Sequence, residues 1–495
     1  MPHLLSKGAL IAGLQCPKRL YLRVHSPDLG ELDALLRSRI DQGHEVGLLA
    51  RAAFPGGVLV EGDLDAALAR TAELVRDPAT SAIYEATFRH GDLLVRADVL
   101  ERRPAGRWRL VEVKAATGVK AHYLWDLAVQ WHVLTGAGLD LESAAVMHLD
   151  REYVFDGVRL DPGRLFAMAD VTTEAARFAR EIPRLASEQL VFLAGLEPPP
   201  VAPGPQCRNP YVCEFYARCN LPLPVDVANL PRLDDALRLD LLERGITRIQ
   251  DLAAEEPLTL LQQRARAAIR SGQPWVGDAL AEALDTLSYP LHFLDFETLS
   301  PAIPRFADMG PYDAIPFQWS LHVVRVPGAD PEHHEFLAPS GGDPRAAFAA
   351  SLASAVAASG SIVVYHEPFE GARLDELAAC LPERAPALQQ MRERLWDLLP
   401  VIRNHVYHPD FRGSFSLKRV LPALVPDLRY EGMEVAEGEM AGIVWEARGR
   451  AEAPEAERLA AALRAYCRQD TLAMVRLLGW LEGRARRPAT RGSTP

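Results

Sequence analysis

The stretch GDLLVRADVLERRPAGRWRLVEVKAAT, residues 91–117, decides the fold of the first half of the chain. Its two apolar runs flank Pro104–Gly106, a pattern that predicts two adjacent strands joined by a turn. In the second run, the period of two places Glu112 and Lys114 on one face, and Asp98 lies near the end of the first strand. Two carboxylates can hold Mg²⁺ or Mn²⁺ against a phosphate, while an ammonium orients or activates the attacking water. The residues alone also fit a solvated strand face with one ion pair.

A second acidic pattern begins with LHFLDFETLS, residues 291–300, which predicts a strand. The alternation of side chains sets Asp295 and Glu297 on one face of this strand. Neighbouring carboxylates on an otherwise apolar strand are costly unless a cation compensates them. A divalent metal is the simplest explanation, and a solvated strand end is the alternative.

Two later segments supply further acidic residues. SIVVYHEPFEGARLDELAA, residues 361–379, predicts a buried strand, a turn and a helix that starts near Glu370. LRAYCRQDTLAMVRLL, residues 463–478, predicts an amphipathic helix with Tyr466 and Asp470 four positions apart on one face. Taken alone, a tyrosine and an aspartate at helical spacing are common, so it is the order of the three segments that makes them notable.

Half of the six cysteines cluster in the proline-rich stretch of residues 196–224. Together with one distant cysteine they make a candidate ligand set: Cys16, Cys207, Cys213 and Cys219. Four thiolates can complete a tetrahedral zinc site or hold an iron–sulfur cluster, and small buried apolar residues are the alternative interpretation. Cys380 and Cys467 lie in apolar helical patterns and are expected in the core.

Composition restricts the class of protein. The chain has 495 residues, a net charge of −12 and 48% hydrophobic residues, which is typical of a soluble protein with two or three domains. The negative charge argues against a protein that coats nucleic acid by bulk electrostatics. The apolar run between Lys7 and Lys18 is too short for a membrane span and unlike a signal peptide, so we expect a cytoplasmic protein without a membrane partner.

The first acidic pattern and the cysteines resemble the RecB-like nucleases of the PD-(D/E)xK superfamily, especially the CRISPR-associated nucleases that carry a four-cysteine iron–sulfur cluster. RADVL, VEVKAA and YLWDLAVQWHVL are similar to successive motifs of that family, over about residues 5–222. The resemblance implies catalytic roles for Asp98, Glu112, Lys114 and Gln130. It also implies a metal ligand at His44, in DQGHEVGLLAR, and a 4Fe-4S cluster on the four cysteines, with zinc as the alternative.

The second acidic pattern resembles the DnaQ-like exonucleases of the DEDDy branch, and FLDFET, GSFSLKRVLPALVP and YCRQDT are similar to an uncharacterised bacterial family found after RecB-like nucleases. The resemblance covers about residues 286–482 and implies Mg²⁺ or Mn²⁺ bound by four carboxylates, with a tyrosine that orients water. The implied residues are Asp295, Glu297, Glu370, Asp470 and Tyr466. Glu370 replaces the usual aspartate of the second motif, and His366 replaces the asparagine four residues before it.

These patterns give an α/β fold class with a restriction-endonuclease-like PD-(D/E)xK domain, a small helical linker and a ribonuclease H-like, DnaQ-type domain. The expected parts are residues 1–222, 223–285, 286–482 and a disordered basic tail, 483–495. In the linker, LLERGITRIQDL predicts two helices joined at Gly245 and resembles a helix-hairpin-helix. We expect Asp397 to cap a helix or to support the acidic site, Ser416 to be a helix N-cap, and Lys418 and Arg419 to contact phosphate or only water.

We expect a metal-dependent nuclease with two active centres that hydrolyse DNA, more as an exonuclease than as an endonuclease. It would act in repair or in defence against foreign DNA. Its partners would be single-stranded DNA or duplex ends, and the resemblance adds a helicase or CRISPR adaptation proteins. Ribonuclease activity is one alternative, because DnaQ-like domains act on both nucleic acids. The other alternative is a nucleic-acid-binding or scaffold protein with one or both centres degenerate, which Glu370 and His366 keep open.

Overall fold

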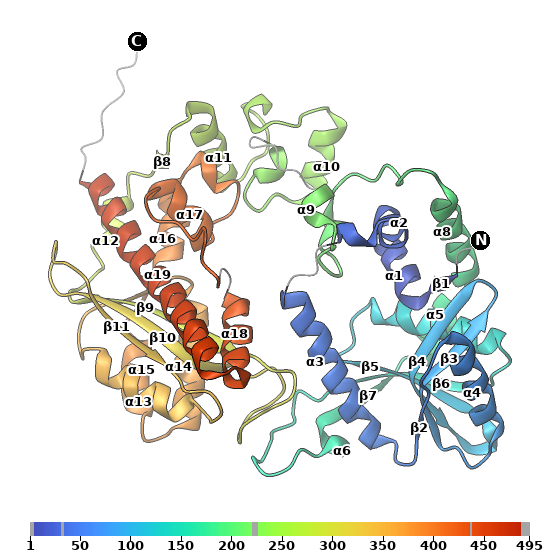
Figure 1. Cartoon of the computed structure of the whole chain (residues 1–495). Coiled ribbons are helices and arrows are strands. Elements are labelled where there is room, and N and C mark those ends of the chain that lie inside the picture. The colour runs from blue at the N-terminus through green and yellow to red at the C-terminus, as the bar shows by residue number, and fades with distance from the viewer. Residues whose placement is uncertain (1–3, 31–33, 220–225, 436–437, 487–495) are drawn as a thin grey trace. The chain divides into compact units, whose positions relative to one another are not determined.

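The computed structural model describes residues 4–30, 34–219, 226–435 and 438–486. Contacts divide the chain into two compact units, which are residues 1–221 with 301–313, and residues 222–300 with 314–495. Each unit is built around its own mixed β-sheet with helices (Figure 1). The α/β class expected from the sequence is therefore confirmed.

The sheet of the first unit has the order β2–β3–β4–β5–β6–β7, and a short β1 pairs with one end of β4. β4 and β5 are the two adjacent strands that residues 91–117 predicted; with β3 they form an antiparallel meander, and β6 lies parallel to β5. Because parallel neighbours need a crossover, the helix α5 (Tyr123–Gly136) connects them. The strands are β1 (Leu5–Ser6), β2 (Val58–Leu59), β3 (Ala82–His90), β4 (Leu93–Arg102), β5 (Trp108–Lys114), β6 (Leu141–Leu149) and β7 (Phe166–Asp170).

Apolar clusters cover both faces of this sheet. Leu110 packs in one cluster with Leu127 of α5, whereas its neighbour Val111 packs in another with Val46 of α3. Successive strand residues face opposite sides, so Glu112 shares the α5 side with Leu110. The other helices of the unit are α1 (Lys7–Gln15), α2 (Pro17–His25), α3 (Ala34–Ala50), α4 (Leu64–Arg76), α6 (Pro162–Leu165), α7 (Thr172–Ala179), α8 (Ile182–Ala194) and α9 (Tyr216–Cys219).

A segment from the second half of the chain, residues 301–313, belongs to the first unit. Ala302 donates its backbone N–H to Gln42, and Met309 forms a β-bridge with Phe155. The Tyr312 hydroxyl donates to the backbone carbonyl of Ala115 at 2.5 Å, one residue after Lys114. The first unit thus includes a loop that the linear order of the motifs gave no reason to expect there.

The sheet of the second unit has the order β11–β10–β9–β12–β13, with β9 at the centre. β10 and β11 run antiparallel to their neighbours, and β12 and β13 run parallel to β9. Phe293 and Leu294 enter different apolar clusters, so β9 has the two-faced pattern that the sequence predicted. The strands are β9 (Leu291–Leu299), β10 (Ile315–Val324), β11 (Glu332–Leu337), β12 (Ile362–Val364) and β13 (Leu395–Asp397), with a separate pair β8 (Trp275–Val276) and β14 (Val406–Tyr407).

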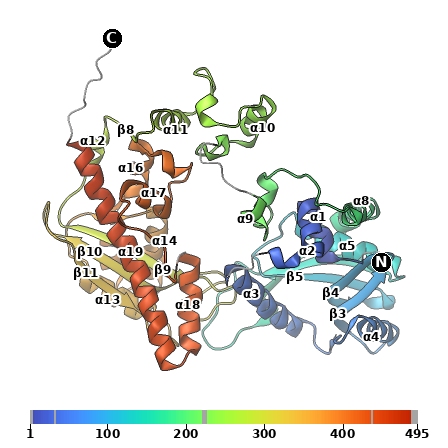
Figure 2. The same ribbon diagram turned by 45° about the horizontal axis from the view of Figure 1, so that its top comes forward.

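The long helix α19 (Ala453–Ala485) packs across β9 and β10 and reaches β9 beside α18 (Gly438–Arg450) (Figure 2). Phe348, Leu374 and Leu388, from three other helices, pack on the opposite face of the sheet. The remaining helices are α10 (Asp235–Glu243), α11 (Leu260–Ser271), α12 (Leu280–Leu284), α13 (Arg345–Ala355), α14 (Glu367–Cys380), α15 (Ala385–Arg392), α16 (Leu398–His405) and α17 (Leu417–Leu424).

Residues 226–285, expected as a linker, share one apolar cluster with β9 and α19. α10 ends just before Gly245, whose φ is +73°, but only a single 3-10 turn, Ile249–Asp251, follows. The prediction of a second helix after Gly245 is therefore wrong. Ile249 and Leu252 are buried in the core, and Arg248 forms a β-bridge with Asp226, which requires an extended backbone.

At the C-terminal end, α19 continues to Ala485, so the expectation of disorder from residue 483 is wrong for 483–485. Leu477, Leu478 and Leu481 bury one face of its last turns and carry the helix beyond the predicted boundary. The part of the expected tail at 487–495 lies outside the described residues.

Asp397 accepts hydrogen bonds at the start of two helices, α14 and α16. Its carboxylate accepts from the backbone N–H groups of His366 and Glu367, each at 3.0 Å, and from Leu399, also at 3.0 Å. His366 has a left-handed backbone, with φ +90°, and α14 begins at Glu367, three residues earlier than predicted. Asp397 is thus the N-cap of α16, and it also fixes the turn that leads into the helix bearing Glu370.

We predict that Asp397→Ala lowers the free energy of unfolding by about 2 kcal/mol, because three N–H groups lose their acceptor. Urea denaturation followed by tryptophan fluorescence measures this. Asp397→Asn keeps one side-chain oxygen and should lose less. Asp234→Ala removes an exposed single cap from α10 and should cost about 1 kcal/mol. Equal losses of unfolding free energy in all three variants would contradict the conclusion that Asp397 caps α16 and also fixes the turn before α14.

Candidate metal centres

The first centre is a buried network around Glu112, whose residue is 2% exposed. Lys114 donates to Glu112 Oε1 at 2.8 Å and to Asp126 Oδ2 at 2.6 Å. Gln130 of α5 donates to Glu112 Oε2 at 2.6 Å, while its own Oε1 is buried without a hydrogen-bond partner. Lys7, at the start of α1, donates to both oxygens of Glu112 at 2.8 and 2.9 Å. The strand β5 and two helices thus converge on one carboxylate.

Charge in this network is balanced by the chain itself. Burial raises the pKa of Glu112, but Lys114 and Lys7 outweigh burial and hold it below its usual range. Burial lowers the pKa of Lys7, but Glu112 and the other acids outweigh burial and raise it. Asp98 differs, because burial and the charge of Glu112 raise its pKa. Glu112 is therefore a carboxylate, and Asp98 holds its proton more tightly than a free aspartate.

Asp98 lies within β4 rather than near its end as expected, at the point where β4 and β5 stop pairing. The ladder between these strands begins at Val99 and Val111, and beyond it the Asp98 carboxylate accepts from the backbone N–H of Val113 at 2.8 Å. One oxygen of Asp98 is thus fixed by the backbone beside Glu112. His44, predicted as a ligand, lies on an exposed position of α3 and contributes no hydrogen bond to the described network.

The four predicted cysteine ligands line one pocket, together with Phe215 and Arg19. Cys207 begins a loop in which the backbone N–H of Cys213 donates to its carbonyl, and the N–H of Gly204 approaches its sulfur at 3.5 Å. The start of α2 and the end of the first unit meet at this pocket. The fold therefore brings together a set that is spread over more than two hundred positions of the sequence.

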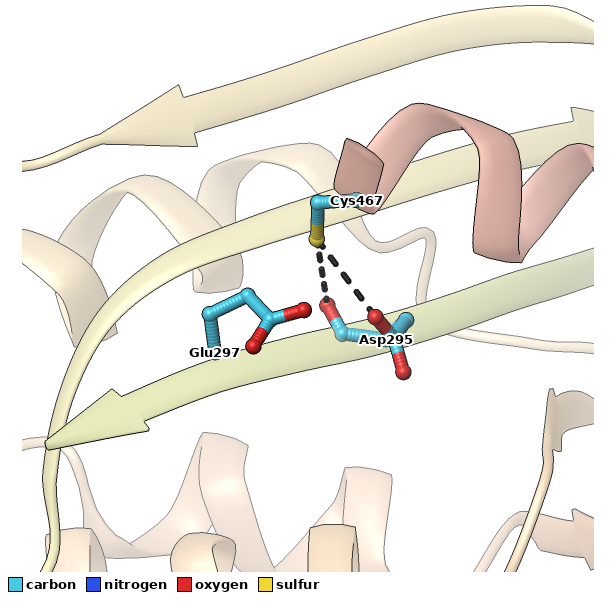
Figure 3. Close-up of side chains that lie close together, drawn as sticks. All are labelled: Asp295, Glu297 and Cys467. Carbon is cyan, nitrogen blue, oxygen red and sulfur yellow. Dashed lines mark hydrogen bonds between the residues drawn. The ribbon is translucent and has the colours of Figure 1, made fainter. Parts of the chain in front are cut away.

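The second centre lies where β9 faces α19 (Figure 3). Asp295 and Glu297 project from β9, and one ligand atom of each lies within 4.8 Å of the sulfur of Cys467. The Cys467 sulfur is 3.5 Å from Asp295 Oδ2 and 3.8 Å from its backbone oxygen. Cys467 is completely buried, as the sequence predicted, but the prediction of a plain core residue missed its contact with a carboxylate.

Two further predicted acids are buried nearby. Asp470 accepts a hydrogen bond from the Tyr430 hydroxyl, and Tyr466, one helical turn earlier on α19, is 3% exposed. Glu370 is 2% exposed, and its Oε2 has no hydrogen-bond partner. Lys418 is the cation here, with its nitrogen 5.0 Å from the centre of the Tyr466 ring.

Burial dominates the electrostatics of this centre. It raises the pKa of Asp295, and the charge of Asp470 adds to the effect. Burial also raises the pKa of Glu297 and Glu370, again helped by Asp295, and it raises that of Asp470 to about 6. Lys418 acts in the opposite direction but does not outweigh burial. Without further positive charge, Asp295, Glu297 and Glu370 hold their protons more tightly than free carboxyl groups do.

Several members of the two centres were not predicted. Lys7 is 105 positions from Glu112, and its place next to Ser6, the N-cap of α1, carries no catalytic signal. Tyr430 lies between α17 and α18, and no motif in the sequence marked it as a member of the site. The positions of Ser416 and Lys418 were anticipated more closely: Ser416 is the N-cap position of α17, although its side chain makes no capping hydrogen bond.

Comparisons with known proteins add little to the geometry. A family model described as a domain of unknown function (DUF2779) matches residues 292–416, which include Asp295, Glu297 and Glu370 but end before Tyr466. No curated protein matches the chain. A solved structure titled "Crystal structure of SSO0001" is similar at 14% identity, with a TM-score of 0.25, over 44% of this chain and 86% of that one. Among the described residues, no helix has the length and apolar character required to cross a membrane.

We predict that metal-free protein becomes less stable as pH rises from about 4 through 6. The folded chain keeps protons on Asp295, Glu297 and Asp470 that the unfolded chain releases, so stability present at low pH is lost as the pH passes the folded pKa values. Glu297→Gln should flatten this dependence in thermal unfolding with a chelator present. Glu332→Gln, at an exposed ion pair, is the control and should leave it unchanged. A Glu297→Gln curve parallel to that of the unaltered protein would contradict the prediction.

Proposed function

We propose that this protein is a divalent-metal-dependent nuclease with two hydrolytic centres that act on DNA. One observation carries the proposal: Asp295, Glu297, Glu370 and Asp470 are buried near one another, burial raises the pKa of each, and Lys418 offsets this effect only in part. Clustered buried carboxyls destabilise a fold unless a cation joins them. Two divalent ions would balance the four charges and could hold the oxygens of a phosphodiester.

The residues fit such ions. In the second centre Asp295, Glu297, Glu370 and Asp470 would hold them, and the unpartnered oxygen of Glu370 is a vacant acceptor for this purpose. In the first centre Asp98 and Glu112 would do so, beside the unpartnered oxygen of Gln130. Bound Mg²⁺ or Mn²⁺ supplies a nucleophile at neutral pH and neutralises charge that develops on the phosphate.

The chain's own residues provide the rest of the chemistry. The Lys114 ammonium is held by Glu112 and Asp126, so its position is fixed before substrate binds, and it would offset negative charge on the phosphate. Tyr466 shares a helix face with Asp470 and would orient the attacking water. The charge of Lys418 stabilises the ionised carboxyl groups. Once metal ions did this instead, Lys418 would be able to contact phosphate.

The strand orders support the proposal. The central strand β9 has an antiparallel neighbour, β10, on one side and a parallel neighbour, β12, on the other, with β11 and β13 at the edges, which is the order expected of a ribonuclease H-like sheet. An antiparallel meander followed by a crossover helix and a parallel strand is the arrangement expected of a PD-(D/E)xK core. The neighbouring strands β4 and β5 carry Asp98 and Glu112, and the central strand β9 carries Asp295 and Glu297.

An iron–sulfur cluster suits the four cysteines better than zinc. Sulfurs on one zinc ion, each about 2.3 Å from the metal, lie about 3.8 Å from one another. The four cysteines line one pocket, but no three of their sulfurs lie within 4.8 Å of one another in the described structure. A cubane cluster spreads its ligands farther apart, because each sulfur binds a different iron.

We predict that the full chain degrades labelled single-stranded DNA only when a divalent metal ion such as Mg²⁺ or Mn²⁺ is present. Glu112→Gln and Asp295→Asn should each lower the rate at their own centre by about 100-fold or more, and the double variant should lose both activities. DNA labelled at the 5′ or the 3′ end separates the two centres and gives the polarity of digestion.

Matched controls are available on the same sheets. Glu101→Gln breaks the ion pair with Arg109 between β4 and β5, and Glu332→Gln breaks the exposed pair with Arg325; neither should alter the rates. Parallel RNA substrates test the ribonuclease alternative. Unaltered rates in both single variants and in the double variant would leave only a binding or scaffold role.

We also predict that protein purified without oxygen is brown and contains about four iron atoms per chain. Cys213→Ser should lose the visible absorbance and most of the iron, whereas Cys380→Ser, outside the pocket, should keep both. A colourless protein with one zinc ion per chain would contradict the cluster.

A further inference from the structure

Cys467 occupies an unusual place for a buried thiol. Cys380 in α14 has its thiol 3.5 Å from the backbone carbonyl of Leu377, one turn earlier in its own helix, which is a common resting place for a helical thiol. The Cys467 thiol instead faces the carboxylate of Asp295 on β9, a strand 172 positions away. A thiol is a weak hydrogen-bond donor, so such a contact stabilises little by itself.

The separation between Cys467 and Asp295 matches that of two ligands on one metal ion. In a tetrahedral zinc site with sulfur about 2.3 Å and carboxylate oxygen about 2.0 Å from the metal, sulfur and oxygen are about 3.5 Å apart. Cys467 Sγ and Asp295 Oδ2 are 3.5 Å apart. Glu297 provides a third ligand atom within 4.8 Å of both (Figure 3). The two strand residues and the helix thus present two oxygens and a sulfur around one point.

A second, independent observation points to a ligand here. Glu370 is 2% exposed and comes from α14 rather than from β9 or α19, and its Oε2 has no hydrogen-bond partner. Its charge interacts with that of Asp295 and Glu297, so it belongs to the same buried cluster. A buried carboxylate oxygen without a partner is costly, and a metal ion would satisfy it.

We infer that Cys467 is a metal ligand of the second centre and that this centre selects a thiophilic ion of the zinc class over Mg²⁺. The inference deepens the proposed function and rests on it. Magnesium prefers oxygen ligands in octahedral geometry, whereas a thiolate favours zinc and its spectroscopic substitute cobalt. The sulfur would therefore set this centre apart from an all-carboxylate site.

Cobalt titration of the full chain tests the inference, because a thiolate on Co²⁺ gives an intense near-ultraviolet charge-transfer absorbance that carboxylates do not give. We expect this absorbance in the unaltered protein. Cys467→Ser should abolish the part contributed by the second centre and weaken Zn²⁺ binding there by at least about tenfold. Subtracting the spectrum of the variant from that of the unaltered protein cancels any contribution of Cys16, Cys207, Cys213 and Cys219.

Cys380→Ser is the matched control and should keep the whole signal. Cys467→Asp is a second variant, which should move the preference from Zn²⁺ toward Mg²⁺; circular dichroism shows whether each variant folds. Unchanged cobalt spectra and Zn²⁺ affinity in folded Cys467→Ser would overturn the inference. If Asp295→Asn still lowered metal-dependent digestion at the second centre in that case, the proposed function would stand. If Asp295→Asn changed neither digestion nor metal binding, the proposed function would fall as well.

Discussion

The burial of four carboxyl groups, which Lys418 offsets only in part, is the constraint on which the second unit depends. β9 brings two of them, α14 one and α19 one, and each element is fixed by apolar packing rather than by the acids themselves. The packing stabilises the fold, and the cluster stores an unfavourable electrostatic energy within it. Protons relieve that energy at low pH, and metal ions would relieve it at neutral pH. Asp397 contributes from outside the cluster by holding the turn before the helix of Glu370.

The two centres solve the same electrostatic problem in different ways. In the first, Lys7 and Lys114 balance Glu112, and Gln130 donates a further hydrogen bond to it, so the centre can be assembled without metal. In the second, the cationic charge is too small, so stability and metal binding are linked. The first centre would therefore exchange a lysine contact for a metal when it binds one, whereas the second would exchange protons.

Local patterns in the sequence predicted what local physics determines. The alternation in residues 91–117 and 291–300 gave the strands and the faces of Glu112 and Asp295, and the four-residue spacing of Tyr466 and Asp470 gave their common helix face. The mixed α/β class followed from the order of these elements.

Contacts between distant segments were beyond such reasoning. Lys7 reaches Glu112 across 105 positions, and the loop of residues 301–313 joins the first unit although the strands on either side of it belong to the second. Cys467 was expected to be buried, and it is, but only the pairing of α19 with β9 places its sulfur at a carboxylate. The second helix near Gly245 failed because tertiary burial of Ile249 overrode a local helical pattern.

Anomalous scattering from crystals of the full chain grown with Mn²⁺ shows whether a divalent ion binds among the buried carboxyl groups of the second unit. We expect an anomalous peak between Asp295 and Glu297, within coordination distance of both carboxylates. This peak should be lost in Asp295→Asn. Clear density for the four carboxyl groups with no anomalous peak among them, at a Mn²⁺ concentration that occupies other sites, would contradict this expectation.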